Sequence, residues 1–207
     1  MKRGIFNFIL ILSAFSFLTR AAHAAKLIPG TQFCSNMQLI DTPKEWQDGQ
    51  VPTSFKADHL VVSKERKKLY LLSEGRLIKE YKVSFGFNYK DGAKDRSGDG
   101  RTPEGLYEIN LKKAKNQTAY HMALQVSYPN KLDLDYAAMK GWDAGSDILI
   151  HGLPSRPVDH LIPDVIKNVH AYRDWTQGCM AVTNQEIEEI FELVETSVPL
   201  EICPLPN

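Results

Sequence analysis

A cysteine and a histidine in the second half of the chain have the residue types of a nucleophile and its base. Cys179 lies in the stretch TQGCMAV (176–182), directly after a glycine. A thiol attacks as its thiolate, and because a free thiol has a pKa of about 8.5, a catalytic cysteine needs a nearby base or positive charge. His151 follows the short apolar run DILI (147–150), so it stands at the end of a rigid element. These residues predict cysteine-based nucleophilic catalysis with His151 as the base.

The residues around Cys179 fit two interpretations. Gly178 permits a tight turn and close approach of a substrate to the backbone, and the amides of Gly178 and Cys179 would then face a developing oxyanion. In the alternative, Gly178 and Cys179 simply begin a buried strand, because free cysteine is among the most buried residue types. The remaining histidines beyond the N-terminal segment fit surface or capping roles better than catalysis; they are His59, His121, His160 and His170.

The first residues predict a secreted protein. Lys2 and Arg3 precede an apolar stretch at 5–18, and Ala22-His23-Ala24 has the form of a signal-peptidase site, so residues 1–24 are predicted to be a cleaved signal peptide. The apolar stretch is shorter than the roughly 20 residues that a membrane span needs, and a retained anchor is the alternative. The mature chain is expected to have no integral membrane segment and to be periplasmic or secreted to the cell envelope.

Composition limits the kinds of partner. Cleavage after Ala24 leaves 183 of the 207 residues, enough for one domain with a sizeable core. Without Lys2, Arg3 and Arg20 the chain has 22 basic residues against 25 acidic ones, a net charge of −3. Nucleic-acid-binding proteins usually carry a basic excess on one face, so no nucleic-acid partner is expected.

The three cysteines are an odd number for an oxidising compartment, which indicates one disulfide and one free thiol. Cys34 lies near the mature N-terminus and Cys203 near the C-terminus, and the two ends of a domain often lie close together. We therefore predict a Cys34–Cys203 disulfide, with Cys179 free.

The elements that must position this chemistry are mostly strands. Residues 25–57 read as an N-terminal extension, and residues 58–203 as the catalytic domain. Alternating or continuous apolar runs predict strands at 59–63, 68–72, 77–87, 105–111, 120–128, 147–152 and 198–202. Helices are predicted at 157–173 and at 184–195, the second from a Thr183–Glu186 capping box and an apolar stripe. The predicted fold class is mainly β with helices, an α+β domain.

Two metal sites were considered from residue type. Asp95, Ser97, Asp99 and Gly100 fit the first half of a calcium-binding loop, but Leu106 stands where a bidentate glutamate is needed. A zinc site from the four residues of suitable type matches no compact ligand spacing; they are His151, His160, His170 and Cys179. We expect neither a metal nor another cofactor.

Three segments in order resemble the YkuD-type L,D-transpeptidases. IHG (150–152) followed by TQGCMAV (176–182) is similar to the family's His-Gly and Ser/Thr-x-Gly-Cys motifs. GDGRTPEGLYEI (98–109) resembles its Gly-x-x-Thr-Pro-x-Gly segment, and the stretch at 59–86 resembles its first strands. The motif DWTxGCxAVTN is typical of a subgroup. The resemblance covers about residues 58–203 and implies a YkuD-like β-sandwich catalytic domain.

The resemblance implies a role for each matching residue. Cys179 is the nucleophile, His151 its base and Gly152 the residue that orients His151. Substrate would contact four residues: Arg101, Trp175 and Thr176 in the cleft wall, and Gly178 at the oxyanion site. The implied reaction is acyl transfer on peptidoglycan stem peptides: the thiol attacks the carbonyl at the L-centre of diaminopimelate in a tetrapeptide, D-alanine leaves, and an amine resolves the thioester.

The implied acceptor and substrate preference remain open. A stem amine would give a crosslink used in wall synthesis or remodelling, a lysine would anchor a protein to the wall, and water would make the protein an L,D-peptidase. Gln177 and Ala181 stand where many relatives have His and Arg or Asn, and the predicted helix at 157–173 lengthens the His151–Cys179 spacing, which suggests a lid. The alternatives outside this chemistry are a non-catalytic wall-binding module and a papain-like protease, whose Cys precedes its His.

Overall fold

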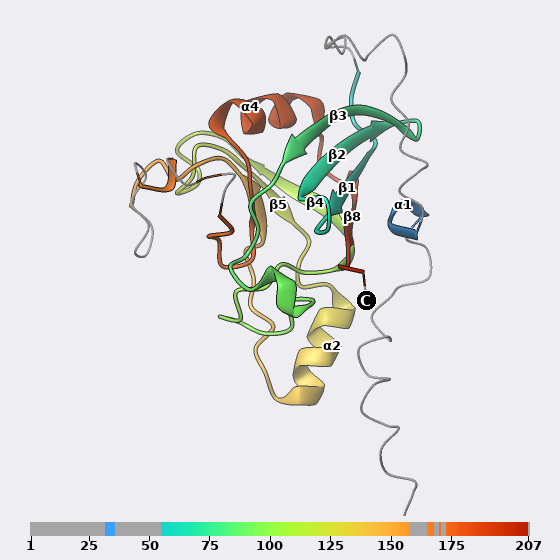
Figure 1. The fold of residues 1–207 in the computed structure, drawn as a ribbon, viewed down its shortest axis with the longest axis vertical. Helices are drawn as coiled ribbons and strands as arrows, with labels where there is room; N and C mark the ends of the chain where they lie inside the picture. Colours follow the sequence, from blue (N-terminus) through green and yellow to red (C-terminus); the bar gives the residue numbers. More distant parts are fainter. Residues whose placement is uncertain (1–31, 36–54, 158–164, 168–169, 171–172, 207) are drawn as a thin grey trace, which may run out of the picture.

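The fold is a computed structural model that describes residues 32–35, 55–157, 165–167, 170 and 173–206 (Figure 1). Its helices are α1 (Gln32–Ser35), the 3₁₀ helix η4 (Tyr89–Asp91), α2 (Lys131–Lys140) and α4 (Asn184–Leu193). Its strands are β1 (His59–Ser63), β2 (Lys68–Ser73), β3 (Arg76–Lys82), β4 (Gly105–Lys113), β5 (Ala123–Val126), β6 (Leu149–His151), β7 (Met180–Ala181) and β8 (Pro199–Cys203). The prediction of a mainly β domain with a few helices is confirmed.

All eight strands belong to one sheet in the order β3-β2-β1-β8-β4-β5-β6-β7. β1 with β8 and β6 with β7 are parallel, and the other neighbours are antiparallel. β4 pairs with β8 through its first residues and with β5 through its later ones, and its register shifts between Ile109 and Leu111. Bulges of this kind bend a strand, so the sheet curls at β4 and its two halves face each other, as the predicted sandwich requires.

The two ends of the sheet approach each other beside β7. The segment after β3 forms a bridge from Ser84 to Ala181 and a second bridge from Gly86 to Thr176. Ser84 and Ala181 exchange two backbone hydrogen bonds of 2.9 and 2.8 Å. The segment that carries Cys179 is therefore held between β6 and the continuation of β3, which fixes the backbone on both sides.

Alternation of side chains along the strands explains the core. Inward residues of both halves, together with one face of α4, form a single buried cluster. Its fully buried members include Leu60, Val62, Leu69, Leu71, Ile109, Leu124, Ile150, Met180, Ile187 and Ile190. α4 packs against β5 and β6, so it supports the strand that ends at His151.

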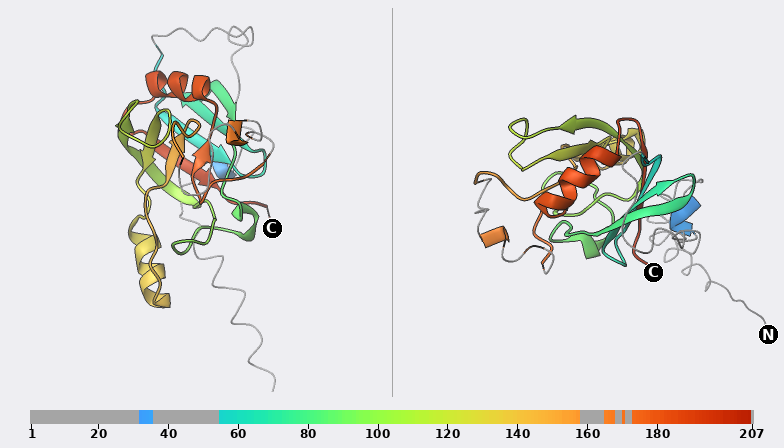
Figure 2. Two further views of the ribbon diagram at one scale, coloured as in Figure 1. Left: turned by 90° about the vertical axis from the view of Figure 1, so that its left-hand side faces the viewer. Right: turned by 90° about the horizontal axis from the view of Figure 1, so that it is seen from above.

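The two long helices differ in how visible they are in the sequence. α4 has the predicted capping box, since the Thr183 hydroxyl accepts from the amide of Glu186 and the Glu186 carboxylate accepts from the amide of Thr183. α2 was not predicted. It starts with an Asn130–Asp133 capping box and projects from the end of the sheet opposite α4 (Figure 2), where most of its apolar side chains are exposed, including Leu132, Leu134 and Met139.

Most predicted strands are observed, with shifted ends. The strand predicted at 59–63 is β1 with the same bounds, whereas the predictions at 77–87, 120–128 and 147–152 extend beyond β3, β5 and β6. Several predictions fall outside the described residues. They are the signal peptide (1–24), His160, most of the helix at 157–173 and most of the extension at 25–57. Within the described ranges, no helix is long and apolar enough to cross a membrane.

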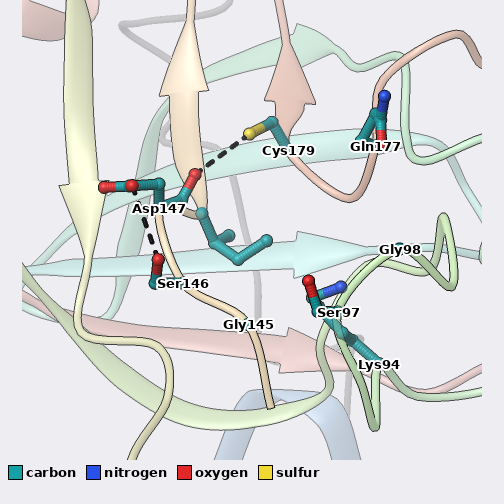
Figure 3. A pocket seen from close by; sticks show the side chains of 9 residues that line it. Lys94, Ser97, Gly98, Gly145, Ser146, Asp147, Gln177 and Cys179 are labelled. Carbon is teal, nitrogen blue, oxygen red and sulfur yellow. Dashed lines mark hydrogen bonds between the residues drawn. The ribbon is translucent and has the colours of Figure 1, made fainter. Parts of the chain in front are cut away.

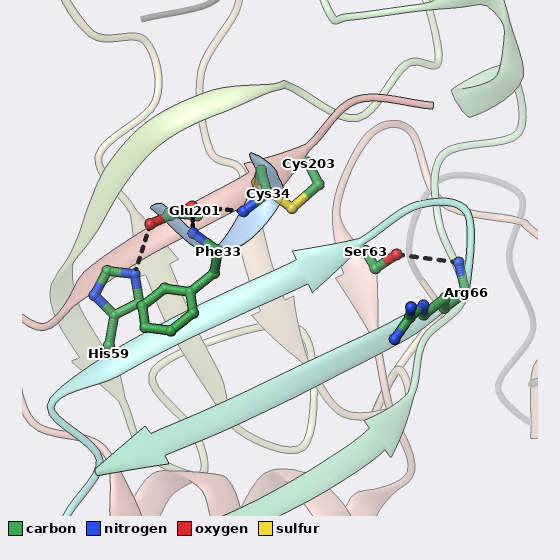
Figure 4. The surroundings of a disulfide bond; sticks show 7 residues. All are labelled: Phe33, Cys34, His59, Ser63, Arg66, Glu201 and Cys203. Carbon is green, nitrogen blue, oxygen red and sulfur yellow. Dashed lines mark hydrogen bonds and ion pairs between the residues drawn. A yellow bond between two sulfur atoms is a disulfide. The ribbon is translucent and has the colours of Figure 1, made fainter. Parts of the chain in front are cut away.

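α1 is fastened to the face of the sheet away from the main core (Figure 4). Cys34 and Cys203 form a disulfide. Phe33 packs with outward-facing residues of β1, β2 and β3 in a second buried cluster. The buried carboxylate of Glu201 accepts hydrogen bonds of 3.1 Å from the amides of Phe33 and Cys34 and from Nε2 of His59. A disulfide, an apolar contact and hydrogen bonds to Glu201 therefore all hold α1 on the sheet.

Candidate active site

The register of β6 and β7 brings His151 and Cys179 to one face of the sheet. These parallel strands pair Ile150 with Met180, and both side chains are buried in the core. Successive side chains of a strand point to opposite faces, so His151 and Cys179, one residue away on each strand, share the other face. Cys179 precedes β7 and lies opposite Leu149, whose amide donates to Sγ at 3.4 Å.

The His151 imidazole is fixed through one nitrogen and unbound at the other. Nδ1 lies 2.6 Å from the carbonyl oxygen of Gly152. Because a carbonyl oxygen only accepts, Nδ1 of the neutral ring carries the proton and Nε2 carries the lone pair. Nε2 is buried and makes no hydrogen bond with the described residues. The arrangement leaves a base of defined tautomer directed away from its backbone partner.

Aromatic rings surround this imidazole. Tyr120 stacks on it with ring centroids 3.7 Å apart and an angle of 23° between the planes. Trp175 meets it nearly edge-on, at 5.7 Å and 71°. The side chain of His151 is fully buried, and this burial lowers its pKa to about 4. His151 is therefore neutral, and able to accept a proton, at the pH of most compartments.

The Cys179 thiol is protonated and turned toward the start of β6. Cys179 is the free cysteine among the described residues, and its Sγ donates to the carbonyl oxygen of Asp147 at 3.5 Å. Burial raises the pKa of the thiol to about 11. Since Nε2 of His151 has no hydrogen-bond partner in the described part of the chain, the thiol and the imidazole are two neutral groups that do not yet form an ion pair.

The turn before Cys179 requires glycine. Gly178 has φ of +132°, and a Cβ there would lie 2.6 Å from the carbonyl oxygen of Arg101. Thr176 closes the turn, because its hydroxyl donates to the carbonyl of Cys179 at 2.7 Å and accepts from the amide of Gly178 at 3.2 Å. The predicted tight turn is thus observed, and its first amide already has an acceptor.

A pocket of about 160 Å³ adjoins Cys179, and His151 is not among the residues that line it (Figure 3). Figure 3 shows Sγ directed at the Asp147 carbonyl, with the side chains of Lys94 and Ser97 across the pocket. Its lining consists of Lys94, Ser97, Gly98, Gly145, Ser146, Asp147, Ile148, Gln177 and Cys179. Gln177 therefore lines the space beside the thiol.

The four residues predicted to contact substrate make different kinds of contact in the structure. Gly178 and Thr176 build the turn, and Trp175 lies against His151. The Arg101 guanidinium donates to the carboxylate of Asp95 at 3.2 Å, and none of the four residues is among those that line the pocket. Their contacts support the backbone and the base.

Sequence reasoning missed several residues of the site. Lys94 and Asp147 line the pocket, and Tyr120 stacks on the base. No local spacing connects Tyr120 with His151, since their contact depends on the pairing of the segment before β5 with the segment after β6. The apolar–polar alternation of 120–128 was the only local signal, and it predicted a strand rather than a role.

The loop at 95–100, which resembles the first half of a calcium-binding loop, is organised by hydrogen bonds. One oxygen of Asp99 accepts from Nζ of Lys94 at 2.8 Å and from the amide of Arg101 at 3.0 Å. The other accepts from the amides of Asp95 and Arg96. These donors hold the pKa of the Asp99 carboxyl below its usual value despite its burial. In the described part of the chain, no group of three His, Cys, Asp or Glu residues is arranged to hold a metal ion.

Comparison with known proteins gives a family match over most of the chain. The YkuD family, described as the L,D-transpeptidase catalytic domain, matches residues 57–202. YafK of Escherichia coli (strain K12), which is named for L,D-transpeptidase activity, is 29% identical over 136 residues, covering 62% of this chain and 45% of YafK. The chain therefore spans about half the length of this curated relative.

Solved structures with similar folds include two from other bacteria. The helical cell shape determining protein Pgp2 from Campylobacter jejuni aligns with a TM-score of 0.49 and 26% identity, over 69% of this chain and 46% of Pgp2. Bd1075 from Bdellovibrio bacteriovorus aligns with a TM-score of 0.48 and 22% identity, over 79% of this chain and 51% of Bd1075.

Proposed function

The chain belongs to the YkuD family of L,D-transpeptidase catalytic domains, and from this premise we propose that it transfers acyl groups of peptidoglycan stem peptides through Cys179. The observation that carries the proposal is the pairing of two functional groups on one face of β6 and β7. One is a free thiol, and the other is a neutral imidazole whose Nε2 bonds to none of the residues that the structure describes. A protein that only bound the wall would need neither.

The first half-reaction starts from the neutral pair. Rotation of the Cys179 side chain brings its S–H from the carbonyl of Asp147 toward Nε2 of His151, which takes the proton as sulfur attacks. Sulfur bonds to the carbonyl carbon at the L-centre of diaminopimelate, giving a tetrahedral oxyanion. Collapse breaks the bond to D-alanine, whose nitrogen receives the proton from Nε2, and leaves a thioester on Cys179.

The second half-reaction reverses these roles. An acceptor amine attacks the thioester carbonyl, passes a proton to Nε2, and forms a new amide as the thiolate leaves and regains that proton. The Gly152 carbonyl keeps Nδ1 protonated throughout, so that Nε2 is the nitrogen that exchanges protons. The amide of Cys179 is the expected oxyanion donor, because the amide of Gly178 already donates to Thr176.

The decisive experiment compares wild type with Cys179→Ala on purified sacculi. Liquid chromatography and mass spectrometry of the released muropeptides would follow tetrapeptides, 3→3 crosslinked dimers and tripeptides. We expect wild type to consume tetrapeptides and release D-alanine, and the variant to leave the profile unchanged. Dimers identify a stem amine as acceptor, whereas tripeptides alone identify water. Equal profiles for wild type and Cys179→Ala would exclude Cys179 as the nucleophile.

Thiol labelling separates an enzyme from a wall-binding module. Because the pKa of Cys179 is raised to about 11, we expect the rate of iodoacetamide alkylation in the folded protein to increase with pH through the range 7 to 10, by roughly tenfold per pH unit. A His151–Cys179 ion pair would instead give a rate that is flat over this range. No adduct on folded protein at any pH would favour the binding module.

The proposed setting follows from the substrate. Stem peptides lie outside the cytoplasmic membrane, so the protein would act in the periplasm or at the cell envelope after loss of residues 1–24. A wall-anchored protein becomes a partner if a lysine is the acceptor.

A further inference from the structure

Four rings form a chain of contacts in the order Tyr120, His151, Trp175 and His170, so the base has a ring on either side. Tyr120 stacks on His151, and Trp175 meets His151 edge-on. Trp175 in turn meets His170 at 6.4 Å and 74° and donates from Nε1 to Nδ1 of His170 at 3.5 Å. Tyr120, His170 and Trp175 will be called the ring cluster. Tyr120 and His170 take no part in the proton transfers described above.

We propose that Tyr120 and His170 are positioning residues for the base: Tyr120 restrains the plane of the His151 imidazole, and His170 holds the Trp175 ring against it. This inference rests on the proposed function for its kinetic consequence, but its structural part concerns His151 alone. It assigns a role to a residue of the segment before β5 and to a residue between β6 and β7.

Tyr120 is held in place by backbone pairing on both sides. It forms a bridge with Pro154, and the neighbouring amides of His121 and Ser155 donate to Leu153 and Ala119 at 2.9 and 3.0 Å. The ring therefore cannot move away without breaking this two-stranded pairing. A ring stacked at 3.7 Å leaves no room for the imidazole to rotate about its Cβ–Cγ bond, and that rotation would take Nδ1 away from the Gly152 carbonyl.

His170 acts on the base through Trp175. His170 is 7% exposed, and its backbone amide donates to the carbonyl of Ile166 at 2.8 Å. Its Nδ1 accepts from Trp175, so the proton of the neutral ring is on Nε2, which is buried and has no partner among the described residues. The indole N–H of Trp175 gains a fixed acceptor from this contact, and its ring gains a fixed orientation.

Protonation of His170 would remove the contact. A doubly protonated ring has no acceptor, and it would place a cation near His151, which disfavours protonation of that residue. Burial lowers the pKa of His170, Glu186 acts in the opposite direction, and Lys82 adds to the lowering. Tyr120 and the Gly152 carbonyl contact His151 directly. His170 acts on His151 through charge and lowers its pKa.

The test combines ring NMR of His151 with steady-state kinetics on five variants. Tyr120→Phe keeps a planar ring, whereas Tyr120→Leu keeps bulk without one. His170→Gln keeps a neutral acceptor, whereas His170→Leu removes it, and Trp175→Phe removes the donor. The His151 signals are assigned by their loss in His151→Asn, and thermal unfolding checks that each variant is folded. Tyr136→Ala, an aromatic substitution in α2, is the control.

We expect Tyr120→Leu to raise the His151 pKa toward 6.5, to mix its two tautomers and to lower kcat by about 10- to 100-fold with little change in KM. Tyr120→Phe and His170→Gln should behave like wild type. His170→Leu and Trp175→Phe should each lower kcat by a smaller factor, about threefold to tenfold. A sixth variant that combines these two substitutions should lower kcat no further than either one alone, because both remove the same contact.

Two results would overturn the inference. One is a Tyr120→Leu variant whose His151 titration, tautomer and turnover equal those of wild type. The other is a loss of turnover that is the same in Tyr120→Phe and Tyr120→Leu, which would assign the effect to the hydroxyl or to folding. If wild type itself has no turnover on sacculi, the proposed function fails, while the NMR of the variants still decides whether the ring cluster positions His151.

Discussion

The molecule contains two clusters of cysteine and histidine on one sheet, and they differ in how their polar atoms are satisfied. At the attachment of α1, both cysteines are joined in a disulfide and His59 donates to the buried carboxylate of Glu201 (Figure 4). At the candidate active site, Cys179 is a free thiol and Nε2 of His151 has no partner among the residues with described positions. Both clusters contain cysteine and histidine, but the first is held in a disulfide and a hydrogen bond, whereas the second offers a thiol and a basic nitrogen.

This difference shows what makes a cysteine–histidine pair reactive. In the first cluster the Glu201 carboxylate also accepts from the amides of Phe33 and Cys34 and both sulfurs are joined in a disulfide, so the cluster offers no thiol, and its contacts stabilise the fold. In the second, the backbone fixes one nitrogen of His151 and leaves the other unbound, at the cost of an unsatisfied buried atom. A buried polar atom without a partner is expensive, which is the reason to assign it a function.

The comparison is tested most strongly by the same substitution in each cluster. His151→Asn removes the proposed base, and we expect turnover of sacculi to fall by about 10²- to 10⁴-fold, the usual contribution of a general base. His59→Asn removes a partner of Glu201, and we expect turnover within a factor of about two of wild type together with a stability loss of about 1 kcal/mol. Kinetics and urea unfolding of both variants are the measurements. Equal losses of turnover would show that the two clusters are not distinct in function.

Removal of the disulfide reverses the pattern of losses. The double variant Cys34→Ala, Cys203→Ala opens a loop that spans 169 residues, and we expect the free energy of unfolding to fall by about 3 to 5 kcal/mol. Turnover by the folded fraction should be unchanged, because His151 lies on β6 and Cys179 directly before β7, whereas Cys203 ends β8. Urea unfolding and kinetics at low denaturant concentration test both parts, and loss of activity in folded protein would show that α1 also shapes the active site.

A pH titration of stability tests whether the His151 ring is buried in its neutral form. The pKa of His151 lies near 4 in the folded protein and near 6.5 when unfolded, so between these values the unfolded chain binds a proton that the folded one does not. Stability from the neutral, buried ring is complete above about pH 6.5 and is lost as the pH falls toward 4, by up to about 3 kcal/mol. Urea unfolding from pH 4 to 7 should show a slope that is smaller in His151→Asn. A slope unchanged by this substitution would contradict the burial of an uncharged ring.

Local sequence patterns were sufficient where an element buries one face. β1 has the predicted bounds, and α4 begins at its predicted capping box. α2 was missed because only Asp133 and Ala137 of this helix are buried, so it has no apolar stripe. Its start was visible as Asn130 three residues before Asp133, a side-chain cap that does not depend on burial.

The candidate site shows a similar limit. His151 and Cys179 could be named from motifs because each follows a local signal, the end of an apolar run and a glycine turn. The stacking of Tyr120 could not, since it requires the register between the chain before β5 and the chain after β6. The contact of Trp175 with His151 could not be predicted for the same reason. Sequence motifs identify the reacting atoms, and the residues that orient them are known only once the strands are paired.

The smallest expected effect concerns the residue that holds the base. A Cβ on Gly152 would lie 2.8 Å from Oδ1 of Asn184 and from Cγ2 of Ile187 in α4, so Gly152→Ala should push the carbonyl away from Nδ1 of His151. We expect kcat to fall about tenfold and stability by about 1 to 3 kcal/mol.

Gly75→Ala is the matched control, because Gly75 has φ of +75° but open space around its Cβ position. It should cost about 1 kcal/mol of stability from backbone strain and leave kcat unchanged. If Gly152→Ala loses stability but keeps the turnover and the His151 tautomer of wild type, α4 does not act on the base through Gly152. The unbound Nε2 must then be oriented by the ring cluster alone, which makes the Tyr120 variants the stronger test of what separates this cluster from the one around Glu201.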